Sequence, residues 1–71
     1  MNDYEYNDAK QQHLQWLRTE HNKAIRELGF CLLEKLAYLE IDNAGMVENT
    51  ENKITNVKNK IQEIENLRKS V

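Results

Sequence analysis

Few side chains in this sequence could do chemistry, and their spacing argues against it. The chain has one cysteine, Cys31, and two histidines, His13 and His21. A nucleophile needs a base within hydrogen-bond reach, yet His21 and Cys31 would lie roughly 15 Å apart along one helix. His13 and His21 would lie two helical turns apart, which is too far for them to share a metal ion. We therefore expect no catalytic residue and no metal site, and we interpret Cys31 as a small core or interface residue.

Carboxylates and glycines lead to the same expectation. Acidic pairs such as Glu63 and Glu65 have no apolar pocket that would raise the pKa of a general acid. Phosphate-binding loops need several glycines, and this chain has only Gly29 and Gly45. The sequence therefore predicts a protein that is not an enzyme and binds no cofactor.

Size and composition limit the remaining possibilities. The 71 residues form one domain, 1–71, with a net charge of −2 and no proline. Chains of fewer than roughly 70–80 residues usually need a disulfide, a metal or a partner chain for stability. A single cysteine cannot form an internal disulfide, so association with another chain is the remaining route.

Targeting signals are not apparent. No apolar run approaches the ~20 residues of a membrane helix, and residues 1–6 lack the apolar core of a secretory signal. One unpaired cysteine fits a reducing compartment. We expect a cytoplasmic protein that does not contact the membrane.

The pattern of apolar residues predicts an all-α fold, an antiparallel hairpin of two helices. We place the first helix at about 8–43 and the second at about 47–70, with residues 1–7 allowed to fray and a start after Asp3 as the alternative. Gly45 and Asn43 are the residues expected to adopt the left-handed conformation that ends the first helix. A kink at Gly29 would instead give three helices.

Two apolar stripes with helical spacing support the hairpin. The first helix carries Leu14, Leu17, His21, Ile25, Leu28, Leu32, Leu36 and Leu39. The second carries Val47, Thr50, Ile54, Val57, Ile61, Ile64, Arg68 and Val71. If the chain reverses at Ala44-Gly45, facing residues have numbers that add up to about 89, so Leu28 meets Ile61 and Leu32 meets Val57.

The first helix has a second apolar stripe on its opposite side, formed by Phe30, Leu33, Ala37 and Ile41. A helix that is apolar on two sides is normally buried on two sides, and the second helix covers only one. We predict that these four residues, with Leu14 and Trp16 of the N-terminal segment that extends past the second helix, contact a partner. A homodimer that forms a four-helix, coiled-coil-like assembly is the simplest partner; a larger protein is the other.

Two resemblances bear on function. The run Leu32-Leu33-Glu34-Lys35-Leu36 resembles the plasmid RNA-binding hairpins that dimerise into four-helix bundles, which implies RNA binding. Residues 25–67 are similar to helical segments that precede zinc ribbons, but the chain lacks the ribbon cysteines, so no metal role is carried over. We assign the chain to neither family.

Charge argues against nucleic acid as the partner. Residues 1–42 hold eight acids and five bases, and residues 43–71 hold four acids and five bases, whereas nucleic-acid-binding domains are normally strongly basic. We therefore expect a small protein–protein interaction module, namely an adaptor, an assembly factor or an inhibitor. A nucleic-acid-binding hairpin is the alternative.

Overall fold

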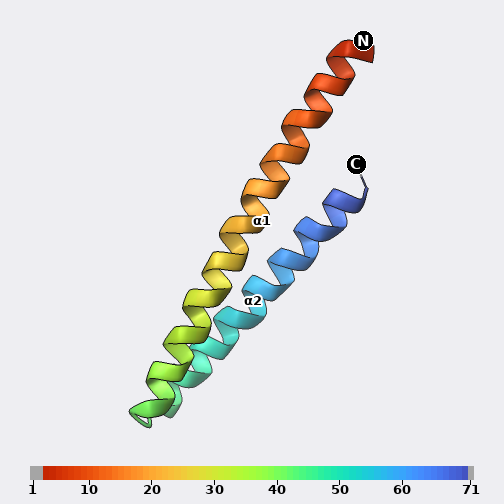
Figure 1. Cartoon of the computed structure of the whole chain (residues 1–71). Helices are drawn as coiled ribbons and strands as arrows, with labels where there is room; N and C mark the ends of the chain where they lie inside the picture. The colour runs from red at the N-terminus through yellow and green to blue at the C-terminus, as the bar shows by residue number, and fades with distance from the viewer. Residues whose placement is uncertain (1–2, 71) are drawn as a thin grey trace.

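Two long helices make up the protein. The structure, a computed structural model, describes residues 3–70. Helix α1 comprises Asp3–Glu40 and helix α2 comprises Ala44–Lys69, and they run antiparallel (Figure 1). No strand occurs in these residues. The predicted all-α hairpin is confirmed.

The helix boundaries differ from the predicted ranges 8–43 and 47–70. Helix α1 begins five residues earlier, and residues 3–7, which we allowed to fray, are helical. Asp3 and Glu5 in its first turn favour this start, because their charges complement the positive end of the helix dipole. Residues 1 and 2 lie outside the described part of the chain.

The turn between the helices uses Asp42 rather than Gly45. Asp42 has a φ of 55°, and its backbone N–H donates to the Leu39 carbonyl at 3.2 Å. The next N–H, of Asn43, donates to the Tyr38 carbonyl at 3.0 Å. This pair of bonds is the Schellman arrangement that ends many helices, normally with glycine in the left-handed position.

Asn43 then begins α2. Its side-chain oxygen accepts a hydrogen bond from the Met46 backbone N–H at 3.2 Å, which satisfies one of the free donors at the helix start. Gly45 therefore lies inside α2, and the prediction that it ends the first helix is wrong. One helix ends and the next begins within three residues.

Gly29 does not divide the first helix. Helix α1 is continuous from Asp3 to Glu40, so the alternative with three helices is wrong. The continuous helix is also the reason for the elongated shape, which measures 60 × 15 × 12 Å. Its N-terminal part extends beyond the end of α2 (Figure 1), as the sequence predicts.

The core is a single seam between the helices. One cluster contains Leu17, Ala24 and Ile64, with Ile61 against it. The other, nearer the turn, contains Cys31, Ile54 and Val57, with Leu28 and Ile61 against it. Leu17 and Ala24 are fully buried. Small residues such as Ala24 and Cys31 in the seam allow the helices to approach closely.

The register of α1 in the seam differs from the predicted stripe. The predicted members Leu17, His21 and Leu28 lie in the seam, but Ala24 and Cys31 occupy the positions expected for Ile25 and Leu32. Seam residues of α1 repeat every seven residues, as in coiled coils. The predicted stripe followed the 3.6-residue period of a straight helix, which drifts by about 20° per seven residues. The chain also reverses near Asn43 rather than at Ala44-Gly45. Facing residues therefore have numbers that add up to about 86 rather than the predicted 89, as in the ion pairs His21–Glu65 and Lys35–Glu51.

Ion pairs border the seam. Lys35 Nζ lies 3.4 Å from Glu51 Oε1, and Lys53 Nζ lies 3.7 Å from Glu34 Oε2. Both pairs join the two helices near the turn. Partly exposed pairs of this kind contribute little to stability, but they favour the observed register over a shifted one.

Candidate protein-interaction surface

A large apolar surface is exposed on the C-terminal half of α1. We call it the outer surface. Its members are Ile25, Phe30, Leu32, Leu33, Leu36, Ala37, Leu39 and Ile41. The seven larger side chains are 46–67% exposed. Contiguous apolar patches on a soluble monomer are normally small, and larger ones mark interaction sites.

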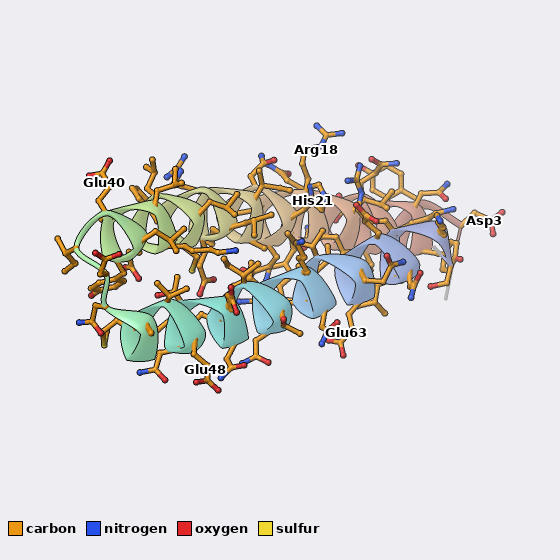
Figure 2. All side chains as sticks on the ribbon, turned by 90° about the horizontal axis from the view of Figure 1, so that it is seen from below. Asp3, Arg18, His21, Glu40, Glu48 and Glu63 are labelled. Atoms are coloured by element: carbon orange, nitrogen blue, oxygen red, sulfur yellow. The ribbon has the colours of Figure 1, made fainter. Side chains whose placement is uncertain are left out.

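The seven-residue repeat explains where the outer surface lies. Leu17, Ala24 and Cys31 face α2, so Leu33, which lies about half a helical turn from this line, is on the opposite side of α1. Phe30 and Leu36, three residues before and after Leu33, flank it. Figure 2 shows Glu40, seven residues after Leu33, pointing away from α2.

Helix α2 has no comparable surface. Leu67 is the one large apolar side chain of α2 that is exposed within the described residues. The outward side of α2 carries charged side chains, and Figure 2 shows Glu48 and Glu63 pointing away from α1. The two helices therefore differ as the sequence indicates: α1 has apolar residues on two sides, and α2 on one.

Sequence reasoning found half of the outer surface. Phe30, Leu33, Ala37 and Ile41 were predicted to contact a partner, and all four are exposed. It missed four others, which it assigned to the core: Ile25, Leu32, Leu36 and Leu39. Counting strictly by seven from Leu17 would have placed these residues beside the seam rather than in it.

The other two predicted contact residues lie elsewhere. Trp16 is 55% exposed and stacks on His13, with ring centroids 6.0 Å apart and an interplanar angle of 16°. Leu14 is half-buried. Trp16 precedes Phe30 by four helical turns, a distance of about 21 Å, so these two residues do not belong to the outer surface.

The part of α1 beyond α2 carries two further exposed aromatic residues. Tyr4 is 82% exposed and Tyr6 is 58% exposed. Tyrosine and tryptophan are common anchors in protein interfaces. This overhanging segment is thus a second exposed aromatic region, separate from the outer surface.

A shallow groove lies beside the turn. Its volume is about 510 Å³, and Tyr38, Leu39, Val47 and Glu51 are among the residues that line it. Leu39 belongs to both the groove and the outer surface. The groove therefore extends the outer surface toward α2, with acidic side chains on its far side.

The cysteine and histidine side chains that could do chemistry make structural contacts or hold no metal site. Cys31 is free and buried against Ile54 and Val57. His21 Nε2 lies 3.4 Å from Glu65 Oε1, across the seam. No group of three or more His, Cys, Asp and Glu side chains in residues 3–70 is arranged to hold a metal ion. In the same residues, neither helix has a segment long and apolar enough to cross a membrane.

Comparison with known protein families, with characterised proteins and with solved structures gives no match to this chain. The outer surface and the overhanging segment are therefore interpreted from their own geometry and chemistry.

Proposed function

We propose that this chain is a non-enzymatic protein–protein interaction module of the cytoplasm, an adaptor, assembly factor or inhibitor that binds through the outer surface of α1. The observation that carries the proposal is the exposure of seven large apolar side chains, six on the C-terminal half of α1 and Ile41 directly after it. Full burial of such a side chain stabilises by about 1.5–3 kcal/mol. Covering the exposed half of each would contribute about 1 kcal/mol per residue.

The total surface supports the same proposal. A compact monomer of 8.5 kDa would expose about 4,650 Å², whereas this chain exposes 5,710 Å². Its radius of gyration is 17.2 Å, against about 11 Å for a compact domain of this length. The excess of about 1,000 Å² is of the size that each partner buries in a standard protein interface. A homodimer with four helices is the simplest assembly that would cover it.

Sedimentation equilibrium at micromolar concentration tests the proposal. We expect a mass of two chains for the natural protein and of one chain for Leu33→Glu, because the new carboxylate would have to be buried in the interface. Asn59→Glu, on the exposed outward side of α2, is the matched control and should keep the mass of the natural protein. Leu33 is itself 64% exposed, so the variant should retain its helical circular dichroism. An identical mass for Leu33→Glu and the natural protein would rule out this interface.

Nucleic-acid binding is the second candidate, favoured by the basic residues of α2. Lys58 and Lys60 are exposed, and Arg68 and Lys69 lie in the last turn. Against it, Lys53 is paired with Glu34, and α2 carries no aromatic residue for base stacking. A salt-dependent shift of labelled RNA or DNA would favour this candidate, and no binding at low salt would exclude it.

A further inference from the structure

Two opposite charges stand at the two ends of the outer surface. Arg26 lies seven residues before Leu33, and Glu40 lies seven residues after it. All three therefore lie on one line along α1, on the side opposite α2. Arg26 and Glu40 are both exposed, and among the described residues neither forms an ion pair within the chain.

This arrangement distinguishes the two ways in which a second copy of α1 could dock. In a parallel pair, Arg26 would face Arg26 and Glu40 would face Glu40, and like charges at close range are destabilising. In an antiparallel pair centred on Leu33, Arg26 of each copy would face Glu40 of the other. The sign of the charges therefore favours the antiparallel pair.

We infer that the occupant of the outer surface is α1 of a second copy of this chain, antiparallel to the first, with the twofold axis near Leu33 and an Arg26–Glu40 pair at each end. The inference rests on the proposed function, because it names the partner and its orientation for the same surface.

Side-chain sizes along the surface match the same pairing. Counting by seven puts Gly29 and Leu36 on one side of the line through Leu33, and Phe30 and Ala37 on the other. A twofold axis at Leu33 brings like sides of the two copies together, so Leu36 would face Gly29 of the second copy and Phe30 would face Ala37. Each large side chain would therefore face a small residue. An added Cβ at Gly29 would meet nothing within 4 Å in the single chain, so packing within the hairpin does not require this glycine. A close approach of α1 from the second copy would require it.

The orientation also determines the length of the assembly. Thirty residues separate Asp3 from Leu33, which is about 45 Å of helix. Two copies that run in opposite directions from Leu33 would therefore extend over about 90 Å. A parallel pair would keep the 60 Å length of one chain. Small-angle X-ray scattering of the dimer distinguishes these two lengths.

Charge reversal tests the pairing itself. Arg26→Glu and Glu40→Arg should each weaken dimerisation by about tenfold, since two attractive contacts become repulsive. The double variant R26E/E40R should restore the Kd to within about twofold of the natural value, because both pairs form again with exchanged signs. Lys60→Glu on α2, which is exposed and changes the net charge in the same direction and by the same amount as Arg26→Glu, is the matched control for that variant and should leave the Kd within about twofold.

The outcomes separate this inference from the proposed function. If Leu33→Glu dissociates the dimer while the double charge variant does not recover, or if the maximum dimension stays near 60 Å, the surface is an interface but the antiparallel pair is wrong. If the natural chain has the mass of one copy at 100 µM, the second copy is not the occupant. In that case the proposed function stands only if a partner protein binds the natural chain and not Leu33→Glu.

Discussion

Replacing Gly29 by alanine should stabilise the single chain. Gly29 lies in the interior of α1, where glycine is about 1 kcal/mol less favourable than alanine, because the flexible backbone loses more entropy on folding. The new methyl group meets no atom within 4 Å, so no steric term opposes the gain. We expect the free energy of unfolding to rise by about 1 kcal/mol, which corresponds to about 4–8 °C in Tm for a domain of this size.

Urea unfolding followed by circular dichroism at 222 nm measures this change. The protein concentration must be low enough for sedimentation to give the mass of one chain, because Gly29 adjoins the outer surface. The slope of the transition should be unchanged, since the substitution alters neither the helices nor the surface exposed on unfolding.

Ala37→Gly provides the matched control. Ala37 is exposed on the same helix, and its replacement should lower the free energy of unfolding by about the same 1 kcal/mol. A Gly29→Ala variant that is no more stable than the natural chain would refute the reasoning. It would mean that α1 is not a regular, open helix at this position.

Further substitutions test the seam and the turn. Leu17→Ala should lower the free energy of unfolding by about 2–3 kcal/mol in the same urea assay, because Leu17 is fully buried between the helices. Asp42→Gly should leave stability unchanged or raise it by up to about 1 kcal/mol, whereas Asp42→Val should lower it by about 1–2 kcal/mol, since a β-branched residue disfavours the left-handed conformation. Asn43→Ala should cost about 1 kcal/mol through loss of the hydrogen bond to the Met46 N–H. Equal stability of the glycine and valine variants at 42, or no effect at 43, would contradict the described turn.

The sequence was sufficient to predict the hairpin and its antiparallel direction. With no proline in the chain, the only strong interruption of the helical pattern lies at 42–45, and both flanking segments have apolar residues at helical spacing. The geometry of the turn was harder to predict from the sequence. Asp42 can adopt the left-handed conformation because its side chain is short and polar, and Asn43 caps α2, so the reversal is complete before Gly45.

Only part of the outer surface was predicted, because the helical periods of a straight helix and a coiled coil differ little. A difference of 0.1 residue per turn between a straight helix and a coiled coil accumulates along a helix of 38 residues. By the second half of α1 the accumulated difference places Ala24 and Cys31 in the seam, where the period of a straight helix would place Ile25 and Leu32. Side-chain size favoured the wrong choice, since Ile and Leu offer more apolar surface to a core than Ala and Cys.

The continuity of α1 has a mechanical consequence. Backbone hydrogen bonds run without interruption from the overhanging aromatic residues to the outer surface, so the two regions are parts of one stiff rod. The separation between Tyr4 and Leu33 is therefore held at about 44 Å of helical rise. A molecule attached at one region is positioned at a constant distance from whatever occupies the other, and this spacing would change in steps of about 1.5 Å for each residue inserted or removed.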